Sequence, residues 1–304
     1  MNYPECITLD NYLHGEDKFV YTVGRGLNWM IQCAKDIGSG AFGVVKRARW
    51  RNRNIALKQC MKINDFTDTK KYLNAINKET KSLVSVDHKH IMKLYGTSSH
   101  SDFLYLLLEY AENGSLDDYL YGKNQNRYKM SNGINLMNQL VNGLAYLHEK
   151  KPKPIIHRDL KTNNLLLTKD YTQLKIGDFG IAKELATKNT TNKGTVIYQA
   201  PEVGSSPAIY TEKCDIYSFG IILWEVISRR KPFDHLDDPN PIACFYKTEM
   251  GDRPPLNIEL ITKCEPLQNL IESCWNHDPE KRPSAKSIQI SKTMKNIKKL
   301  MRKM

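Results

Sequence analysis

The chain has 304 residues, 40% of them hydrophobic and 26% charged, and its 45 Lys and Arg against 33 Asp and Glu give a formal charge of +12. This composition excludes a mainly disordered chain, and no apolar run approaches the roughly 20 residues that span a bilayer. The amino terminus lacks the apolar stretch of a secretory signal, and the seven cysteines show neither a CxxC pair nor the spacing of a disulfide framework. We therefore expect reduced thiols and a cytoplasmic location.

The N-terminal part of the chain is predicted to be rich in strands. Residues 1–30 show no apolar periodicity and are predicted to form an irregular N-terminal extension. Short apolar runs separated by polar turns predict four strands, at 44–50, 53–59, 93–97 and 103–109. Between the second and the third, apolar residues at helical spacing predict a helix over 66–86. We interpret residues 31–110 as a small lobe built on a sheet.

After Asn113-Gly114 the apolar spacing becomes helical. Apolar stripes predict helices over 134–147 and 216–226, and the second is apolar on nearly all sides, which indicates deep burial. Residues 168–210 are rich in Lys, Thr, Asn and Gly and are predicted to form a long loop, which at this length is usually functional. The predicted fold is α+β, with a larger helical lobe at 111–292.

Much of the positive charge lies at the C-terminal end of the chain. The last twenty residues contain seven basic ones, Lys286, Lys292, Lys295, Lys298, Lys299, Arg302 and Lys303. Aliphatic residues alternate with them, so we predict an amphipathic helix that buries its apolar face and ends in a basic segment at 293–304. No aromatic residue is interleaved for base stacking, so nucleic acid is not an expected partner. Composition alone supports membrane binding no more strongly than it supports nucleic-acid binding.

A glycine cluster and a strand lysine are the first candidates for chemistry. The cluster Gly38-Ser39-Gly40-Ala41-Phe42-Gly43 could bring backbone N–H groups close to phosphate oxygens, although such a cluster is more often a plain turn. It lies between two predicted strands and not before a helix, which disfavours a dinucleotide site. Lys58 ends the next strand and could hold phosphates if a carboxylate such as Glu79 orients it; an exposed strand lysine is the other interpretation.

Three later motifs decide between these interpretations. The run from His157 to Asn164, HRDLKTNN, is followed by Asp178-Phe179-Gly180 and then by Ala200-Pro201-Glu202. With the glycine cluster and Lys58, their order and spacing match the signature of protein kinases. Over about residues 31–292 the sequence therefore resembles a protein kinase. The resemblance implies the two-lobed protein-kinase fold, with a small antiparallel sheet and one helix in the N-lobe, and ATP and Mg²⁺ as cofactors.

The resemblance also implies a role for each residue of the site. Asp159 would accept the proton of the substrate hydroxyl, and Lys161 would stabilise charge at the γ-phosphate. Asn164 and Asp178 would be the Mg²⁺ ligands. Lys58, oriented by Glu79, would hold the α- and β-phosphates. The nucleotide would be bound by Ile37, Gly38, Ser39, Gly40, Ala41, Phe42, Gly43, Val45, Ala56, Lys58, Glu79, Glu109, Ala111 and Leu166.

Further matches concern residues that support the site. The adenine ring would bond to backbone groups of Glu109 and Ala111, with Leu108 behind it at the gatekeeper position. Glu202 would pair with Arg282, and Asp215 would brace the catalytic loop. The stacked spine of the active state would consist of His157, Phe179, Leu83 and Leu94.

The substrate class follows from a few positions. Lys161 and Gly194-Thr195 follow the serine/threonine pattern, whereas Cys274-Trp275 and Trp224-Glu225 resemble the tyrosine-kinase-like branch. Within that branch the chain is most similar to the TGF-β-activated kinases, a family of mitogen-activated-protein kinase kinase kinases, from which it departs at Tyr198-Gln199. The resemblance implies MAP kinase kinases as protein substrates and an upstream activating kinase or activator protein.

The same resemblance places the phosphoacceptors of activation at Thr187 and Thr190. The family continues well beyond Met304, so we expect the chain to correspond to the kinase domain alone. Two alternatives stay open. A pseudokinase would keep the fold without catalysis, although Lys58, Glu79, Asp159, Asn164 and Asp178 are all present. A basic binding module could also use the kinase fold as a frame.

Overall fold

The computed structural model describes residues 5–9, 12–13, 21–22, 29–40, 43–50, 53–62, 86–100, 103–123, 128–178, 196–204, 210–236, 240–291 and 293–301. The chain separates into two compact units. The N-unit comprises Met1–Ala111 and Ile181–Thr190, and the C-unit comprises Glu112–Gly180 and Thr191–Met304.

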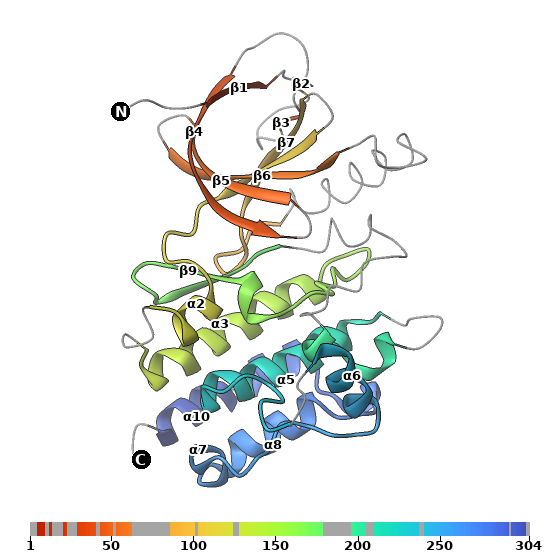
Figure 1. The fold of residues 1–304 in the computed structure, drawn as a ribbon. Helices are drawn as coiled ribbons and strands as arrows, with labels where there is room; N and C mark the ends of the chain where they lie inside the picture. The colour runs from red at the N-terminus through yellow and green to blue at the C-terminus, as the bar shows by residue number, and fades with distance from the viewer. Residues whose placement is uncertain are drawn as a thin grey trace. The chain divides into compact units, whose positions relative to one another are not determined.

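The N-unit is built on a single eight-stranded sheet (Figure 1). Its strands are β1 (Glu5–Leu9), β2 (Tyr12–Leu13), β3 (Tyr21–Thr22), β4 (Trp29–Gly40), β5 (Gly43–Trp50), β6 (Arg53–Lys62), β7 (Leu94–His100) and β8 (Phe103–Glu109). Their order across the sheet is β1-β4-β5-β6-β8-β7-β3-β2, and every neighbouring pair is antiparallel except β3–β7. The four strands predicted from apolar runs are confirmed.

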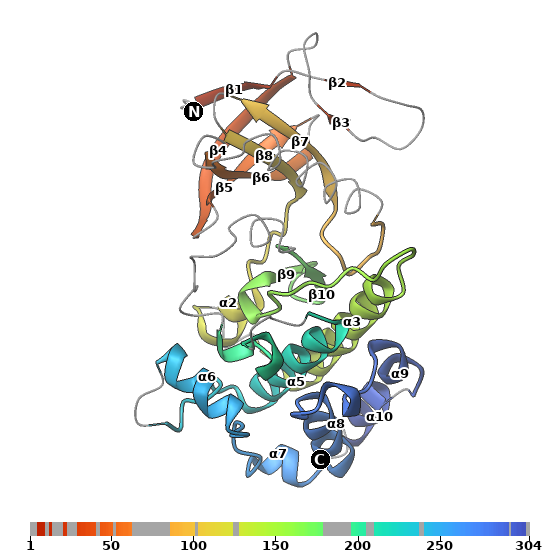
Figure 2. The same ribbon diagram turned by 90° about the vertical axis from the view of Figure 1, so that its right-hand side faces the viewer.

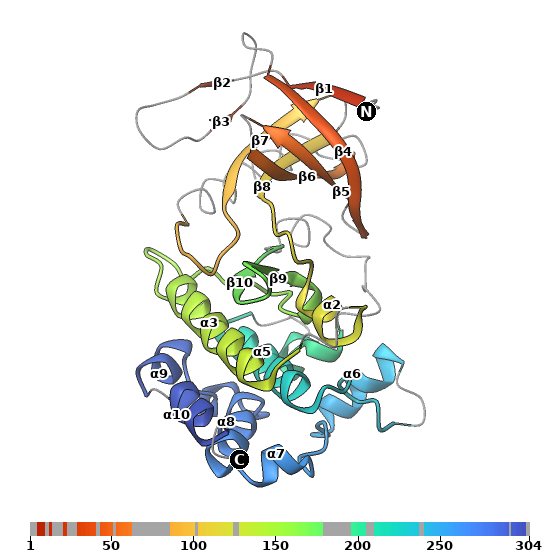
Figure 3. The same ribbon diagram turned by 90° about the vertical axis from the view of Figure 1, so that its left-hand side faces the viewer.

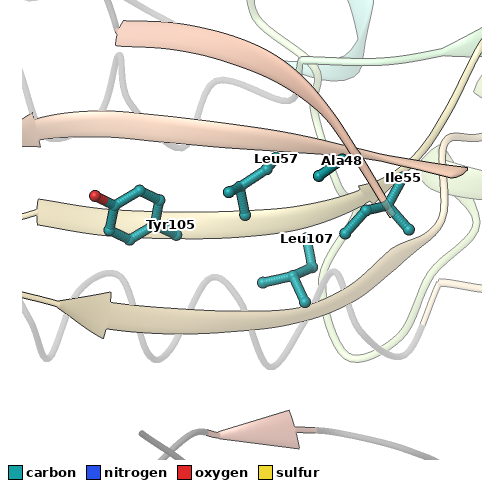
Figure 4. Packing of buried hydrophobic residues seen from close by; sticks show 5 residues of the cluster. All are labelled: Ala48, Ile55, Leu57, Tyr105 and Leu107. Carbon is teal, nitrogen blue, oxygen red and sulfur yellow. The ribbon is translucent and has the colours of Figure 1, made fainter. Parts of the chain in front are cut away.

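One face of this sheet carries the hydrophobic core of the N-unit. Alternate residues of β5, β6 and β8 point to that face and are buried together, namely Ala48, Ile55, Leu57, Tyr105 and Leu107 (Figure 4). Because side chains of a strand alternate between faces, the residues between them point to the other face. That second face carries the predicted nucleotide-binding residues of β5 and β6.

The prediction of an irregular extension over residues 1–30 is wrong at β1, β2, β3 and the first two residues of β4, which all lie in this range. β1 pairs with β4 in antiparallel register, so that Ile7 lies opposite Ile31 and Leu9 opposite Trp29. The apolar residues of β1 are too few to show a pattern on their own, and the strand forms because β4 offers it a hydrogen-bonding edge. The helix predicted over 66–86 lies, except for its last residue, outside the described residues.

The C-unit is mainly helical and includes a two-stranded sheet of β9 (Leu165–Thr168) and β10 (Gln173–Ile176). Its helices are α2 (Leu116–Tyr121), α3 (Met130–His148), α5 (Glu212–Ser228), α6 (Pro241–Glu249), α7 (Glu259–Thr262), α8 (Glu265–Cys274), α9 (Ala285–Ile290) and α10 (Thr293–Met301). Helix α5 is buried from Cys214 to Ile227 and contacts α3 and α8, while α3 also contacts α9, α10 and β10 (Figures 2 and 3). The predictions of helices over 134–147 and 216–226 are confirmed.

Two predictions for the C-unit need correction. The long loop predicted over 168–210 contains strand β10, because Leu174 and Ile176 are fully buried and β10 pairs with β9. The amphipathic helix predicted at the C-terminal end is two helices, since α9 ends at Ile290 and α10 begins at Thr293. Along the part of the chain that the structure describes, no helix is long and apolar enough to cross a membrane.

Candidate functional site

The predicted site residues divide between the two units. In the N-unit, the register of the sheet sets their order across the strands. Gly38 on β4 lies opposite Val45 on β5, Val45 lies opposite Lys58 on β6, and Lys58 lies opposite Leu106 on β8. Directly opposed residues share a face of a sheet. The glycine hairpin, Val45 and Lys58 therefore form one row on the face opposite the hydrophobic core.

Lys58 is the charged group of this row. Its side chain is 8% exposed, and Ala56, two residues earlier on the same strand and therefore on the same face, is 7% exposed. A lysine on such a face keeps its stem among apolar neighbours such as Val45 and Leu106 and presents only its ammonium. This placement fits a cation held for phosphates better than the exposed strand lysine that the sequence also allowed.

The glycine cluster forms a hairpin between β4 and β5. Gly40 pairs with Gly43, and Gly43 has a φ of 128°, a conformation that favours glycine. Ile37, next to Gly38, is 42% exposed. Ala41 and Phe42 at the tip lie outside the described residues. The backbone of the hairpin thus lies one strand away from Lys58, as a phosphate cover requires.

The segment predicted to bond adenine follows β8. The backbone N–H of Glu109 donates to the carbonyl of Lys93 at 2.8 Å, and the N–H of Lys93 donates to the carboxylate of Glu109 at 3.2 Å. Leu108, the predicted gatekeeper, lies opposite Ala56 across the β6–β8 pair. Ala111 is the residue at which the N-unit gives way to the C-unit.

In the C-unit, the loop from His157 to Asn164 brings three predicted residues into contact. The side-chain amide of Asn164 donates to the carbonyl of Asp159 at 2.7 Å and to its Oδ2 at 3.1 Å. Lys161 Nζ lies 3.1 Å from the same Oδ2. Asp159 is 5% exposed and Asn164 6%, so the loop holds this carboxylate nearly buried between an amide and an ammonium. Such an arrangement fixes the orientation of the carboxylate, as a group that accepts a proton from a bound hydroxyl requires.

Asp215 on α5 holds the start of this loop. Its carboxylate accepts hydrogen bonds from the backbone N–H groups of His157, at 2.8 Å, and Arg158, at 3.0 Å, and lies 2.9 Å from His148 Nε2. Arg158 has a φ of 67°, a conformation that costs energy for a residue with a side chain and needs such support. Burial opposes ionisation of Asp215, but the His148 contact and the backbone donors outweigh it and hold its pKa below the usual value. The predicted brace is confirmed.

Asp178 is placed by its neighbour in the chain. The carbonyl of Gly177 lies 2.8 Å from His157 Nε2, and the N–H of Gly177 donates to the carbonyl of Asn164 at 2.9 Å. These two bonds tie the segment before Asp178 to the catalytic loop. Asp178 itself is exposed and has a φ of 52°.

The donor set of this segment fits a magnesium ion. The amide nitrogen of Asn164 donates to Asp159, so the side-chain oxygen is the atom that this amide would offer to a cation. Asp178 adds a carboxylate, and two hard oxygen donors with water in the remaining positions are what Mg²⁺ prefers. Among the described residues no group of three or more His, Cys, Asp or Glu could hold a metal on protein ligands alone.

An ion pair links the Ala200-Pro201-Glu202 motif to the end of the C-unit. Arg282 donates to both carboxylate oxygens of Glu202, at 2.6 and 2.8 Å, and its side chain is fully buried. Burial opposes ionisation of Glu202, but the hydrogen bonds from Arg282 outweigh it and lower its pKa. The predicted pair is confirmed, and Arg282 also donates to the carbonyl of Lys213 at 3.1 Å, which links Glu202 to the start of α5.

Sequence reasoning missed a buried network at the other end of α5. Glu225 is fully buried and accepts hydrogen bonds from the hydroxyls of Tyr121, at 3.0 Å, and Tyr198, at 2.9 Å. The Tyr198 hydroxyl also lies 3.2 Å from Thr162 Oγ1, inside the catalytic loop. Thr162 in turn donates to Asp117 at 3.1 Å. Only Tyr198, a departure from the family pattern, could have signalled this network.

Several predicted residues cannot be placed. Outside the described residues lie Glu79, Leu83, Phe179, Thr187, Thr190 and Thr195, together with Ala41 and Phe42.

Two further predicted residues are placed on strands. Leu166 lies on β9, opposite Lys175 of β10, and forms an isolated bridge with Ser115. Leu94 is the first residue of β7 and lies opposite Leu108.

Comparison with known proteins agrees with this arrangement. The sequence pattern described as "Protein kinase domain" matches residues 31–293. The sequence is 41% identical to mitogen-activated protein kinase kinase kinase 7 of Drosophila melanogaster, over 85% of this chain and 36% of the relative. It is 42% identical to the protein of the same name in Homo sapiens, over 85% of this chain and 40% of the relative. Seven transmembrane domain-containing tyrosine-protein kinase 1 of Dictyostelium discoideum is 37% identical over 82% of this chain and 36% of its own length. The chain thus spans about two fifths of the length of these relatives. Its pattern and its relatives show that the chain belongs to the protein kinase family.

Proposed function

We propose that this chain is an ATP- and Mg²⁺-dependent protein kinase that transfers the γ-phosphoryl group of ATP to serine and threonine hydroxyls. The observation that carries the proposal is the contact of Asp159 with both Lys161 and Asn164. Burial of a carboxylate costs free energy unless the group is paired and hydrogen-bonded, and here Lys161 and Asn164 supply both partners. A charged group held in this way is a candidate for function, which favours a kinase over a pseudokinase.

The chemistry follows from the charges of phosphoryl transfer, which asks the protein mainly for positioning and charge stabilisation. Asp159 would accept the hydrogen bond of the substrate hydroxyl and take its proton as the phosphoryl group moves. Lys161, 3.1 Å from Asp159, would offset the charge of the γ-phosphoryl oxygens. Asn164 and Asp178 would hold Mg²⁺, which neutralises phosphate charge when bound. Lys58 would hold the α- and β-phosphates beneath the hairpin of β4 and β5.

A point substitution with a matched control tests this assignment. Asp159→Asn keeps the side-chain shape and removes the proton acceptor, so we expect turnover to fall at least ~10²-fold. Lys58→Met should lower turnover to a similar extent through lost phosphate positioning. Asp170→Asn makes the same chemical change at an exposed turn residue between β9 and β10 and should leave turnover unchanged. Equal phosphate transfer by wild type, Asp159→Asn and Lys58→Met would contradict the proposal.

The hydroxyl specificity and the protein substrate are finer points of the same proposal. Lys161 favours serine and threonine, and the relatives named mitogen-activated protein kinase kinase kinase 7 support MAP kinase kinases as substrates. The cysteine pattern favours a cytoplasmic place of action. The Dictyostelium relative is named a tyrosine-protein kinase, so phosphoamino-acid analysis decides between the classes. Phosphorylation of purified MAP kinase kinases on Ser or Thr is the expected result; predominant phosphotyrosine would refute the specificity.

Regulation of the activity is proposed from the activation segment. Thr187 and Thr190 match the phosphoacceptor positions of the TGF-β-activated kinases, and Arg158 precedes the catalytic Asp159, where it could pair with a phosphate. An upstream kinase or an activator protein would supply the signal. The double substitution of Thr187 and Thr190 by Ala should lower activity and leave ATP affinity unchanged, and full activity of that variant would exclude the switch.

A further inference from the structure

A strongly basic surface of the C-unit lies along α9 and α10, and the proposed activity makes no use of it. From residue 285 to residue 304 the sequence contains seven Lys and Arg and no Asp or Glu. The apolar sides of the two helices are buried, with Ile288, Met294 and Ile297 at most 3% exposed. The helices are therefore anchored, and their lysines are left on the outside.

Three side-chain contacts tie α9 and α10 to α3 and to the residue that follows it. Lys286 forms an ion pair with Glu149 at 2.9 Å, Gln289 donates to Asn142 at 2.9 Å, and Lys298 donates to Asn135 at 3.4 Å. The three partners on and after α3 span 14 residues, which corresponds to about 20 Å of helix. Helix α3 contains no Asp or Glu, so it adds no negative charge along this length.

The basic surface also extends past its Glu149 end. Lys150, Lys151 and Lys153 follow Glu149 directly, and the last two are exposed. Among the described residues, Glu149 is the single acidic group that an ion pair joins to α9 or α10. Helix α8, which also contacts α10, carries Glu265 and Glu272, and no ion pair among the described residues joins either of them to α9 or α10.

Two aliphatic side chains of the same helices are also exposed. Ile290, the last residue of α9, is 64% exposed, and Leu300 near the end of α10 is 41% exposed. At 100° per residue, the outward arc of α10 carries Lys295, Lys299 and Leu300. Each of these side chains offers apolar area that a membrane interface would cover.

We propose that this α9–α10 surface docks the chain on a bilayer that contains anionic phospholipid. In this arrangement the lysines would lie among the headgroups, and Ile290 and Leu300 would reach the boundary of the acyl region. Clusters of four to eight basic residues on amphipathic helices bind such membranes, and mixed basic and aliphatic outer faces favour the interface. The proposal concerns where the chain acts and is independent of its catalytic chemistry.

The composition of the surface favours a bilayer over other anionic partners. Apart from the C-terminal Arg302, its cations are lysines, which act as hydrated point charges and lack the two-pronged geometry with which arginine recognises single phosphates. Neither α9 nor α10 contains an aromatic residue on which a base could stack. An acidic peptide would be held by the lysines alone, whereas a bilayer also covers Ile290 and Leu300.

Vesicle co-sedimentation of the full chain tests the docking surface. Phosphatidylcholine vesicles are compared with vesicles that also contain phosphatidylserine, at low and at physiological salt. We expect binding to the second kind alone, weakened by salt. The Lys295→Gln, Lys299→Gln double variant should bind about 25-fold more weakly, from about fivefold for each lysine near an anionic surface. Both lysines are exposed, so folding and kinase activity without vesicles should be unchanged.

A second double variant controls for net charge. Lys247→Gln with Lys263→Gln removes the same two charges from exposed positions on α6 and after α7, and should bind vesicles as wild type does. Ile290→Ser should weaken binding to vesicles and leave binding to soluble polyglutamate unchanged. The proposal is overturned if phosphatidylserine does not increase vesicle binding, or if the two double variants lose vesicle binding to the same extent. It is also overturned if the chain does not bind vesicles but binds RNA or polyglutamate through Lys295 and Lys299. Phosphate transfer is measured separately, so a failure of vesicle binding can be distinguished from a failure of the proposed kinase activity.

Discussion

Replacing Glu225 by glutamine should remove a pH-dependent cost of folding that the wild-type chain carries. Glu225 is fully buried on α5, and the hydroxyls of Tyr121 and Tyr198 donate to its two oxygens. Lys231 Nζ lies 3.7 Å from Oε1 and favours the charged form. Burial outweighs these contacts and raises the pKa of Glu225 to about 7 from its usual 4.5.

The sign and size of the effect follow from proton binding. Below pH 4.5 the carboxyl group is protonated in the folded and the unfolded chain, and its ionisation costs nothing. Between pH 4.5 and about 7 the unfolded chain releases the proton while the folded chain keeps it, so the free energy of unfolding falls as the pH rises. Above about pH 7 the free energy of unfolding falls no further. The total loss is about 3 kcal/mol for this difference in pKa between the folded and the unfolded chain.

Urea unfolding at a series of pH values measures this contribution. The Glu225→Gln variant cannot ionise, so relative to wild type it should gain about 3 kcal/mol between pH 5 and pH 8. Glu272→Gln, which removes an exposed carboxylate of α8, controls for the loss of one negative charge. Tyr198→Phe removes a donor to the charged form and should move the transition to higher pH. A difference between wild type and Glu225→Gln that does not change from pH 5 to pH 8 would refute the reasoning.

Two further predictions concern the packing of the C-unit. Arg282→Met should lower the free energy of unfolding by about 3–5 kcal/mol in urea titrations, because it leaves the carboxylate of Glu202 without its bidentate partner; adding Glu202→Gln should recover part of this loss, and an additive double variant would contradict the pairing. Gly220→Ala should lower the melting temperature, since a Cβ there would lie 2.8 Å from Cys274 Cβ and overpacking costs about 1–3 kcal/mol; a melting temperature equal to or above that of wild type would show that α8 can move away.

The elements that the sequence predicted are those whose signal lies within one segment. Helices α3 and α5 repeat apolar residues over several turns, and β5, β6 and β8 are short apolar runs with clear ends. Asp159, Lys161 and Asn164 lie within six residues, so one local motif was enough to single them out, and the structure adds the contacts among them. Tertiary partners decide the other cases. β1 depends on β4, and β10 depends on β9 and on Gln139, which accepts a hydrogen bond from the N–H of Leu174.

Contacts between distant residues could be predicted only where the family resemblance supplied them. Glu202 and Arg282 are 80 residues apart, and the resemblance paired them correctly. Tyr121 and Glu225 are 104 residues apart, and no pattern in either segment indicates that they meet. The break between α9 and α10 was missed for a related reason, because the apolar spacing continues through it while Ile290 is left exposed.

Helix α5 shows how one buried element can give two carboxyl groups opposite properties. Asp215 and Glu225 are ten residues apart, which corresponds to about 15 Å along the helix. Burial disfavours the charge of both. Asp215 gains two backbone N–H donors and a contact with His148, and its pKa falls. Glu225 gains two neutral hydroxyls and a lysine at 3.7 Å, and its pKa rises to about 7.

The difference between these two groups matters for the catalytic loop. Because its pKa is lowered, Asp215 stays charged around neutral pH. It therefore keeps its hydrogen bonds with the backbone N–H groups of His157 and Arg158 there. Glu225 instead reaches the loop through Tyr198, whose hydroxyl lies 3.2 Å from Thr162 Oγ1. Ionisation of Glu225 strengthens the hydrogen bond that it accepts from Tyr198, and the polarised Tyr198 hydroxyl becomes a better acceptor toward Thr162. The same buried helix therefore holds one end of the loop independently of pH and contacts the other end through a group that titrates near neutral pH.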